Sequence, residues 1–432
     1  MTSAFLSKRA LSYPENPIRG LSSLAFEAES QGIAVLPLNI GAPDTATPIE
    51  IRNGGAHFLQ TTDAIRYGAS IGNATLIQKM FEFYTKRLRI KGIEISMMMI
   101  TQGASEALDL VLYTIANKGE TILTPDPCYS NYISMAYKYN VILKPIATTI
   151  DSGFHLIKKN ETKTQAFKRI EKLITPQTKA ILWSSPGNPT GVIFSSSELR
   201  ILLSLARKHK LMLIADEVYR LLVLNKANKN KQILRAPSIL DVASKKDLEH
   251  IIVLDSASKM LSFCGGRVGI VVAAKNIVMQ LVKQSSVRGC PSTISQAAVD
   301  NINQVKDAYF FESQREFKKR RDALHQGLLS LKHTGLSVFP QPPEGAFYIV
   351  ADLGNGVNAE DYCKWMLTEY PRLSGKKETV FLTPMQMKTG GFYLQKGKGL
   401  SQIRIAYVLQ VSMLNRAVAV IGDSLKMYKR LH

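Results

Sequence analysis

The stretch IIVLDSASKMLSFCGGRVGIVVAA, residues 251–274, decides the fold of this chain. It begins with an apolar run of strand length, Ile251–Asp255, and ends with a second one, Ile270–Ala273. Such short apolar runs are typical of strands that are buried on both faces of a sheet. Between the runs, two serines precede one lysine, Lys259, and two glycines precede one arginine, Arg267. Since ligands of open α/β sheets bind beyond the carboxyl ends of the strands, Lys259 is a candidate functional residue.

The same alternation of apolar runs and helical patterns extends from about residue 97 to residue 275. Apolar residues recur at helical spacing in Ser105–Asn117 and in Glu198–His209, and the second segment begins with a capping box of Ser195 and Glu198. The other expected strands are Met97–Thr101, Thr121–Thr124, Ala180–Ser184 and Leu211–Ala215. Strands that alternate with helices predict an α/β domain, in which helices cover both faces of a mostly parallel sheet.

The chain is too long for one ordinary core, and its pattern changes after about residue 305. From there short strands and helices are mixed, beginning with a long charged helix over Phe310–Leu329. This pattern predicts a smaller α+β domain, against which we expect the segment up to Pro48 to pack. The expected division is a large domain of residues 49–305 and a small domain of residues 1–48 with 306–432. The glycine-rich segment Gly390–Gly399 is expected to be a mobile flap over the site.

Composition narrows the class of protein. No apolar run is long enough for a membrane helix, and the amino terminus lacks the pattern of a secretory signal, so we expect a cytoplasmic protein without a membrane partner. The four cysteines form no CxxC pair and the seven histidines show no zinc spacing, so neither a disulfide framework nor a metal site is expected. The net charge of +21 is dispersed in short clusters, which favours the basic surface of an enzyme over a nucleic-acid partner.

Two more polar residues follow predicted strands. Asp216 ends the strand in ADEVY, residues 215–219. It either caps the next helix or pairs with a protonated ring nitrogen of a cofactor, whose ring oxygen Tyr219 would then reach. Asn188 lies in SSPGNPTG, residues 184–191, where two prolines and two glycines predict a rigid turn that presents the amide.

A phosphate site is indicated by the segment Thr101–Ser105, which joins a predicted strand to a predicted helix. Its small residues let backbone N–H groups approach a phosphate, and the amino terminus of the helix adds a positive partial charge. Arg267 would bind the same phosphate through two parallel hydrogen bonds, and Ser256 and Ser258 would add hydroxyl donors. Burial and neighbouring cations would keep the Lys259 amine partly deprotonated, as condensation with an aldehyde requires. The lysine, aspartate and phosphate-loop patterns also occur in chains without a ligand, whereas the SSPGNPTG loop is more specific, and the weight of all of them comes from their occurrence together.

Eight motifs occur in an order that resembles a known family. They are NIGAPD (39–44), TQGASEAL (101–108), PDPCYSNY (125–132), SSPGNPTG (184–191), ADEVY (215–219), SASK with GGRVG (256–269), PEGAFY (343–348) and RIAY (404–407). The set resembles the class I and II pyridoxal-phosphate-dependent aminotransferases of fold type I, over about residues 14–428. It is most similar to their bacterial and archaeal aspartate-aminotransferase-like branch. The resemblance implies a mostly parallel seven-stranded sheet in the large domain and pyridoxal 5′-phosphate as the cofactor.

The resemblance also implies which residues contact the cofactor. Lys259 matches the lysine that forms a Schiff base with the cofactor and then moves the substrate proton. Asp216 matches the partner of the pyridine nitrogen. Asn188 and Tyr219 match the groups that bind the oxygen on the ring, and Tyr129 matches the aromatic residue that stacks on the ring.

Further positions are implied for the phosphate and the substrate. The phosphate positions are Ala104, Ser105, Ser256 and Arg267, with Ser258 as a further hydroxyl donor. Tyr67 matches the tyrosine that reaches the phosphate in the neighbouring subunit, which implies a homodimer. Arg404 matches the arginine that holds the substrate α-carboxylate, and Gly41 and Asn188 line the same pocket.

The expected reaction is a ping-pong transfer of the amino group from an L-amino acid, aspartate or a related one, to a 2-oxo acid such as 2-oxoglutarate. One departure from the family leaves the side-chain preference open. A group of aspartate aminotransferases carries a lysine in the phosphate loop, as GGK, for the distal carboxylate, whereas this loop reads Gly103–Ser105 without a lysine. Arg19, Lys388 and Arg288 are candidates to replace it.

Other functions are also considered. A cysteine-S-conjugate β-lyase or an enzyme like aminocyclopropane-carboxylate synthase would use the same lysine on the same fold. Gly68–Gly72 matches the GxSxG pattern of α/β-hydrolases, but the preceding Thr61–Tyr67 is polar and not strand-like. A pyridoxal-phosphate-binding transcription regulator would need an added DNA-binding domain, for which we expect no room before Pro14.

Overall fold

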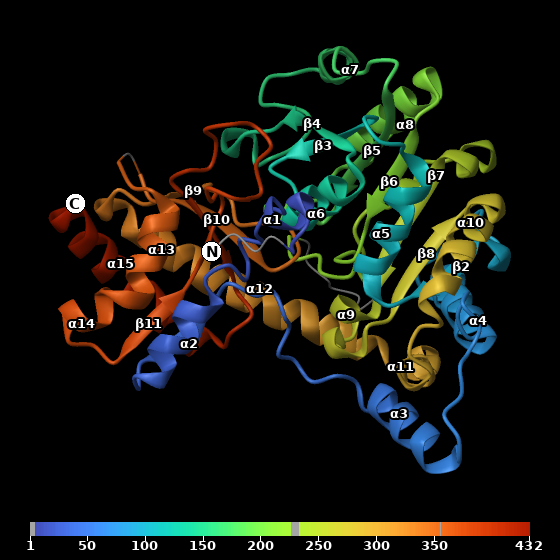
Figure 1. Cartoon of the computed structure of the whole chain (residues 1–432), viewed down its shortest axis with the longest axis horizontal. Helices are drawn as coiled ribbons and strands as arrows, with labels where there is room; N and C mark the ends of the chain where they lie inside the picture. The colour runs from blue at the N-terminus through green and yellow to red at the C-terminus, as the bar shows by residue number, and fades with distance from the viewer. Residues whose placement is uncertain (1–4, 226–232, 355) are drawn as a thin grey trace.

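A computed structural model of the chain describes residues 5–225, 233–354 and 356–432. A seven-stranded sheet with the order β2-β8-β7-β6-β5-β3-β4 forms its larger part (Figure 1). The strands are β2 (Met98–Thr101), β3 (Thr121–Asp126), β4 (Ile142–Ala147), β5 (Thr178–Ser184), β6 (Met212–Asp216), β7 (Ile251–Ser256) and β8 (Gly269–Ala273). β8 runs antiparallel to β2 and β7, and all other neighbouring strands are parallel. The predicted mostly parallel sheet is therefore confirmed.

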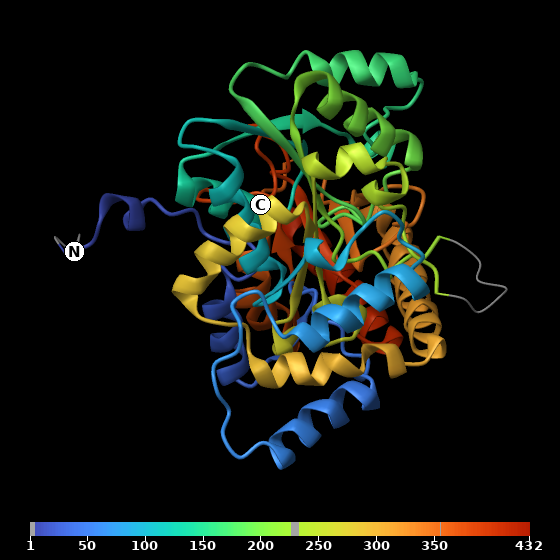
Figure 2. The same cartoon turned by 90° about the vertical axis from the view of Figure 1, so that its right-hand side faces the viewer.

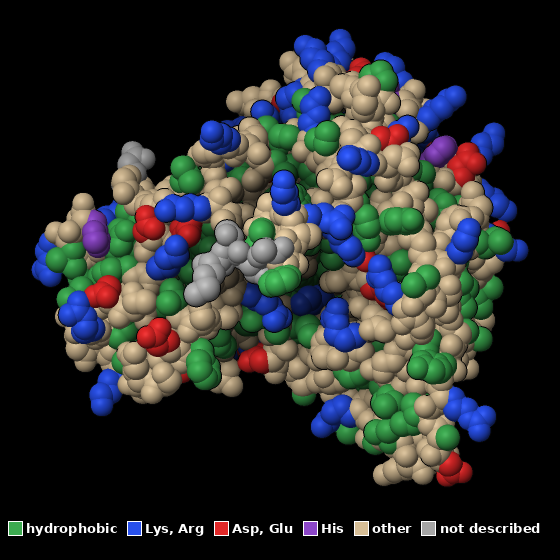
Figure 3. All heavy atoms as spheres, viewed as in Figure 1, with side chains coloured by type: hydrophobic (Ala, Val, Ile, Leu, Met, Phe, Trp, Pro, Cys, Tyr) green, Lys and Arg blue, Asp and Glu red, His purple; other side chains and the backbone are tan. Residues whose placement is uncertain are grey.

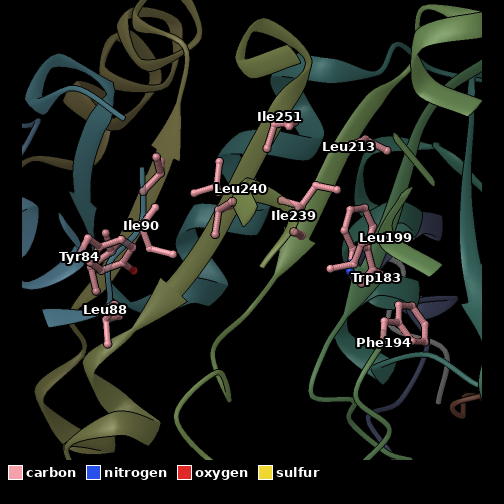
Figure 4. Packing of buried hydrophobic residues seen from close by; sticks show 14 of the residues in the cluster. Tyr84, Leu88, Ile90, Trp183, Phe194, Leu199, Leu213, Ile239, Leu240 and Ile251 are labelled. Atoms are coloured by element: carbon pink, nitrogen blue, oxygen red, sulfur yellow. The ribbon is translucent and has the colours of Figure 1, made fainter. Parts of the chain in front are cut away.

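Helices cover both faces of this sheet. They are α5 (Gly103–Ile115), α6 (Ser130–Tyr139) and α10 (Lys275–Ser285) on one face, and α4 (Ala74–Glu82), α7 (Lys163–Glu171) and α8 (Ser196–His209) on the other. Successive strand residues point to opposite faces, so Ile252 and Leu254 of β7 pack in the first core, whereas Ile251 and Val253 pack in the second. Figure 4 shows part of the second core, where Ile251 and Leu213 lie on adjacent strands. Burial on both faces explains why these strands are continuous apolar runs in the sequence.

β4 is the strand of this sheet that the sequence pattern did not predict. It lies at one edge, next to β3, and most of its side chains are only partly buried. Its sequence ILKPIA includes Lys144 and Pro145, residue types that proteins place on edge strands. An edge strand needs no continuous apolar run, so the signal that marked the central strands is missing here.

The smaller part of the molecule contains two further sheets. β9 (Ser337–Val338), β10 (Tyr348–Asp352), β12 (Thr383–Pro384) and β13 (Gln402–Ala406) form an antiparallel sheet with the order β12-β13-β10-β9. β1 (Ala34–Pro37) pairs in parallel with β11 (Glu378–Phe381). The helices are α2 (Ser22–Ser30), α13 (Ala359–Thr368), α14 (Tyr370–Ser374) and α15 (Val411–Leu431). Segments from both ends of the chain thus form one α+β unit.

The long helix α12 (Asp307–Ser330) connects the two parts. Phe310, near its beginning, packs in the larger core against Phe83, with ring centroids 5.9 Å apart. Phe317 and Leu324, further along, pack in the core of the smaller part. Figure 1 shows α12 extending from below the large sheet to the smaller part. We propose residues 49–305 as the large domain and residues 1–48 with 306–432 as the small domain, with α12 packed against both.

Two short helices and one longer helix lie outside these layers. α3 (Ile49–Thr61) packs on α11 (Thr293–Val299), at the lower edge of Figure 1. α1 (Lys8–Leu11) belongs to an amino-terminal segment that projects from the body of the molecule in Figure 2. Apolar Phe5 and Leu11 are exposed on this segment. In the described part of the chain, no helix has the length and apolar character needed to cross a membrane.

The glycine-rich segment 390–399 connects the two domains. Its Phe392 side chain is buried, and the Phe392 carbonyl accepts a hydrogen bond from the Cys128 N–H at 2.8 Å. The backbone N–H of Leu394 donates to the buried carboxylate of Asp126 at 2.8 Å, and the side chain of Gln395 donates to the same carboxylate at 2.8 Å. The segment is therefore packed against the large domain through both apolar and polar groups, and its expected role as a mobile flap stays a prediction.

His155 forms a second connection between the domains. Its Nδ1 atom lies 3.1 Å from a carboxylate oxygen of Glu198 at the start of α8, and its Nε2 atom lies 3.4 Å from Glu344 in the segment before β10. Burial by itself lowers the pKa of His155, but its contacts with the two carboxylates outweigh burial and raise this pKa to about 10. The imidazolium therefore bridges two anions from different domains at neutral pH.

A His155→Gln variant is expected to lose about 2 kcal/mol of unfolding free energy at pH 6, since a hydrogen-bonded charge is removed. The folded protein binds this proton more tightly than the unfolded chain does. The stabilisation is therefore complete below about pH 6.5 and disappears as the pH rises towards 10. Urea unfolding of both proteins at pH 6, 8 and 9.5 measures the difference. A His333→Gln variant, which changes an exposed histidine, is the control, and a pH-independent difference for His155→Gln would contradict the bridge.

Candidate active site

One cleft with a volume of about 500 Å³ lies at the carboxyl ends of the parallel strands, between the two domains. Figure 3 shows lysine and arginine side chains around a hollow near the middle of the molecule, close to where Figure 1 draws α9 (Ala257–Met260). All predicted site residues except Tyr67 line the cleft: Gly41, Ala104, Ser105, Tyr129, Asn188, Asp216, Tyr219, Ser256, Ser258, Lys259, Arg267 and Arg404. The structure thus brings together residues that lie as far apart in the sequence as Gly41 and Arg404.

Parallel strand ends account for this convergence. Asp216 is the last residue of β6, and Ser256 is the last residue of its neighbour β7. The hydroxyl of Ser256 accepts a hydrogen bond from the Ser258 N–H at 3.1 Å, which caps the single turn of α9 that follows. That turn carries Lys259, so the lysine faces the cleft directly beyond the sheet edge.

Lys259 lies in a partly buried environment of carbonyl, sulfur and aromatic groups. Its Nζ atom donates to the Gly41 carbonyl at 2.7 Å and lies 3.5 Å from Sγ of Cys264. The same nitrogen lies 5.6 Å from the ring centroid of Phe347 and 5.9 Å from that of Tyr219. No carboxylate in the described residues forms an ion pair with Lys259, so the amine is available for chemistry rather than held by a counter-ion.

Asp216 is a buried carboxylate without a cationic partner among the described residues. Its Oδ2 atom accepts a hydrogen bond from the Tyr132 hydroxyl at 2.6 Å. Burial raises the pKa of Asp216 to about 6, although this bond and a backbone contact from Val218 oppose the change. A cation in the cleft would stabilise the ionised form of this buried carboxylate.

The loop after β2 and the segment before β8 form a cradle. Gly103 has φ +76°, and a Cβ atom on it would overlap the guanidinium of Arg267. A glycine is therefore needed for both the backbone conformation and the close approach of the arginine. Ala104 and Ser105 lie in the first turn of α5, whose backbone N–H groups lack helical partners. An arginine beside a helix amino terminus is a suitable site for an anion such as a phosphate.

Arg404, on β13, is fully buried and has no carboxylate partner in the described residues. Its Nη1 atom donates to Oδ1 of Asn188 at 3.0 Å, its Nη2 atom donates to the Asn39 carbonyl, and its Nε atom has no partner. The guanidinium lies 4.4 Å from the ring centroid of Tyr348 and 5.2 Å from that of Phe392. Burial lowers the pKa of Arg404, which means that the charged form lacks compensation in the protein. The cleft is thus prepared for an anionic ligand.

Three aromatic contacts of the site were not assigned from the sequence. Tyr132 lies one helical turn after Tyr129, so its helical spacing was the available signal. Tyr348 ends the PEGAFY motif, and its hydroxyl lies 2.8 Å from the Tyr219 hydroxyl. A Cβ atom on Gly41 would overlap the Tyr348 hydroxyl, so only glycine fits there. Phe392 had no signal, because only the folding of segment 390–399 brings it to Arg404.

Tyr67 does not line the cleft of its own chain. Its side chain is 95% exposed, in a segment without helix or strand between α3 and α4. The same segment has no strand before Ser70, so the GxSxG pattern does not form the strand-to-helix turn of a hydrolase nucleophile. Within the ranges that the structure describes, no cluster of three or more metal-ligating side chains is found either.

The three cations considered for a distal carboxylate lie in different places. Arg19 lines the cleft, whereas Lys388 and Arg288 do not. Arg288 forms ion pairs with Asp109 and with Glu106. Arg19 is therefore the one of the three that the cleft accommodates.

Known proteins resemble this chain over nearly its full length. The aspartate aminotransferase of Thermotoga maritima is 26% identical over 422 residues, which cover 97% of this chain and 99% of that one. The aromatic-amino-acid aminotransferase 2 of Thermococcus litoralis is 27% identical over 418 residues, or 96% of each chain. The crystal structure of the Thermotoga maritima aspartate aminotransferase matches with a TM-score of 0.81 and 25% identity, over 97% of this chain and 100% of that chain. Fold and site thus define a pyridoxal-phosphate-dependent enzyme with the aspartate aminotransferase fold.

The family model "Aminotransferase class I and II" matches residues 33–419. Since this range is most of the chain, the protein belongs to the class I and II aminotransferase family, and it is an enzyme of the transaminase type. The cleft fits pyridoxal 5′-phosphate on its own chemistry. The unpaired carboxylate of Asp216 suits a protonated pyridine nitrogen, and the cradle of Gly103 and Arg267 suits a phosphate.

Proposed function

We propose that the enzyme transfers the amino group of an L-amino acid, aspartate or a related one, to a 2-oxo acid such as 2-oxoglutarate in a ping-pong reaction. The observation that carries this proposal is that Lys259, Asp216 and Arg404 line one cleft, and that none of them forms an ion pair in the described part of the chain. The amine of Lys259 is then free for an aldehyde, the carboxylate of Asp216 for a protonated ring nitrogen, and the guanidinium of Arg404 for a substrate carboxylate.

The cofactor contacts are proposed from the family resemblance, and the residues that it implies line the cleft. Asp216 would bind the ring nitrogen, Asn188 and Tyr219 the oxygen on the ring, and Tyr129 one face of the ring. The phosphate would be held by Ala104, Ser105, Ser256, Ser258 and Arg267. When bound, pyridoxal 5′-phosphate supplies an aldehyde and an electron-withdrawing ring that stabilises negative charge on the substrate α-carbon.

Lys259 would move the proton of the reaction. Its amine would hold the aldehyde of pyridoxal 5′-phosphate, and where the substrate amino group occupies the aldehyde instead, the free Lys259 amine would remove the proton from the substrate α-carbon. The Gly41 carbonyl, 2.7 Å from Nζ, orients this amine towards the cleft, and the rings of Phe347 and Tyr219 reduce the access of water. The same nitrogen would then deliver the proton to the former aldehyde carbon, as an amino transfer requires, so one residue would serve both ends of the proton transfer.

Arg404 would bind the substrate α-carboxylate through its guanidinium, with Asn188 and Gly41 beside it. The carboxylate of a bound substrate would provide the negative charge that the buried guanidinium of Arg404 lacks in the protein. Arg404 and Lys259 belong to different domains, so the packing of the domains fixes the distance between them. A substrate whose α-carboxylate is bound by Arg404 would therefore have its α-carbon placed next to the Lys259 amine.

We also infer a homodimer in which Tyr67 reaches the phosphate in the neighbouring subunit. The exposed ring of Tyr67 and the exposed apolar side chains of Ile65, Phe5 and Leu11 are groups that a contact between subunits would bury. Analytical ultracentrifugation should give the mass of two chains, and a purely monomeric active enzyme would contradict the inference. We place the enzyme in the cytoplasm, since its four cysteines are all free. Cell fractionation tests that placement.

The function is tested with aspartate labelled with ¹⁵N and with 2-oxoglutarate. The label is expected to appear in glutamate, in a one-to-one ratio with oxaloacetate, and each substrate alone should give no more than one turnover. Release of pyruvate and ammonia from an amino acid without a 2-oxo acid would instead support a β-lyase or a related elimination, and it would contradict the proposed transfer.

A further inference from the structure

We propose that Arg19 binds the side-chain carboxylate of the substrate, and that the enzyme therefore prefers amino acids with a second anionic group. The inference rests on the proposed function, because it assigns the α-carboxylate to Arg404. It answers the question left by the phosphate loop, whose Gly103–Ser105 segment has no lysine for a distal carboxylate. Overall similarity does not decide the preference, since relatives of nearly equal identity are named for aspartate and for aromatic amino acids.

The charges that line the cleft are unbalanced. Four cationic side chains line it, namely Lys259, Arg267, Arg404 and Arg19, against one carboxylate, that of Asp216. The proposed function uses the first three cations and the carboxylate. Arg19 is left without a role, and its guanidinium forms no hydrogen bond or ion pair with the other residues that the structure describes.

The backbone around Arg19 is held on two sides. The Asn16 side chain accepts from the Ile18 N–H at 3.0 Å and donates to Oδ1 of Asn131, on α6 of the large domain, at 2.7 Å. The N–H groups of Arg19 and Gly20 donate to the Asn16 carbonyl at 3.1 and 2.8 Å. The guanidinium thus extends from a turn that is fixed against the large domain, rather than from the projecting terminus.

Asn39 connects this turn to the site of the α-carboxylate. Its side chain donates to the Ile18 carbonyl at 2.8 Å, and its own carbonyl accepts from Nη2 of Arg404. One buried residue therefore positions both arginines, which line the same cleft. Two guanidinium groups that line the same cleft are suited to a ligand with two carboxylates, because each carboxylate can bind its own cation.

The part of the cleft lining that belongs to neither the cofactor contacts nor Arg404 fits the same substrate class. Asn16 and Asn131 are polar residues beside Arg19, and Ile40 and Met135 are apolar. An apolar wall suits the short methylene chain of an acidic amino acid, while the polar group at its end would meet Arg19. Arg19 is exposed at the cleft, so a neutral aliphatic or aromatic side chain would simply make no charge-assisted contact with it and would gain less from this part of the lining.

The test compares acidic and neutral amino donors in the cofactor-loaded enzyme. The measured quantity is the ratio of kcat/KM for aspartate or glutamate to kcat/KM for leucine or methionine, with a fixed 2-oxo acid. We expect Arg19→Gln to lower this ratio about 10- to 100-fold, since a charge-assisted contact to substrate is lost. Arg19→Lys should keep most of the ratio, because the charge remains.

Lys388→Gln is the matched control. Met387 lies beside Gly20, so Lys388 belongs to a segment adjacent to the Arg19 turn, but its exposed side chain does not line the cleft. The same loss of one positive charge there should leave the ratio unchanged. The inference is overturned if Arg19→Gln leaves the ratio unchanged, if it lowers both classes of substrate equally, or if Lys388→Gln has the same effect. A wild-type enzyme that transaminates no amino acid would instead overturn the proposed function, so the two failures are distinct.

Discussion

A Lys259→Ala variant is expected to lose about 10⁴-fold in kcat, together with the absorbance of cofactor that is covalently joined to the protein. Lys259 is the one lysine among the residues that line the described cleft, and its amine is 2.7 Å from the Gly41 carbonyl. Alanine has no group that could join the aldehyde or take the proton from the substrate α-carbon. Water in its place is a much weaker base and is not held in position, so both functions are lost together.

Two measurements separate this effect from a loss of folding. Equilibrium dialysis should show that the variant still binds pyridoxal 5′-phosphate, because the phosphate and ring contacts are unchanged. Lys283→Ala, at an exposed position on α10, should retain full activity and absorbance. A Lys259→Ala enzyme with more than about one tenth of the wild-type turnover would show that another residue moves the proton.

Asp216→Asn is expected to lower kcat by about 10³-fold while leaving the protein folded. Asparagine has nearly the same shape and can still accept the hydrogen bond from Tyr132. It carries no negative charge, so it cannot hold the ring nitrogen in its protonated form, and the ring withdraws electrons less strongly. The loss should therefore appear in kcat and in the absorbance of the bound cofactor more than in the KM for the amino acid.

The stability of the cofactor-free protein gives an independent readout for Asp216. Burial raises the pKa of this carboxyl to about 6, so the folded state holds the proton more tightly than the unfolded chain does. Ionisation of Asp216 therefore lowers the free energy of unfolding as the pH rises from about 4 to about 6, and this loss remains above pH 6. At pH 8 the Asp216→Asn protein should be at least as stable as the wild type in urea unfolding, although its activity has fallen.

Asp300 offers a matched control for this comparison. Burial also raises the pKa of Asp300 to about 6, but its side chain does not line the cleft. Asp300→Asn should therefore share the stability effect at pH 8 and retain the wild-type kcat. A similar loss of kcat in both variants would mean that Asp216 acts through the structure of the protein and not through the effect of its negative charge on the cofactor ring.

Much of the large domain could be predicted because its signals are local. Strands such as β7 are buried on both faces, so each is a short apolar run, and Ser195 with Glu198 marks the start of α8. Edge strand β4 was missed since burial on a sheet edge is incomplete. The contacts of the glycine-rich segment 390–399 with the buried carboxylate of Asp126 had no signal in the sequence, because they join segments that are distant in the chain.

The sequence by itself determined which side chains follow the strand ends, and hence that Asp216, Asn188 and Lys259 would meet at one edge of the sheet. That inference needed only the rule that parallel strands end at the same edge. The tertiary structure alone showed which of the three candidate cations, Arg19, Lys388 and Arg288, lines the cleft together with Arg404. Asn39 binds both Arg404 and the turn of Arg19, through contacts between segments that are distant in the chain. Such contacts depend on how two domains pack, and no local pattern of residues records that packing.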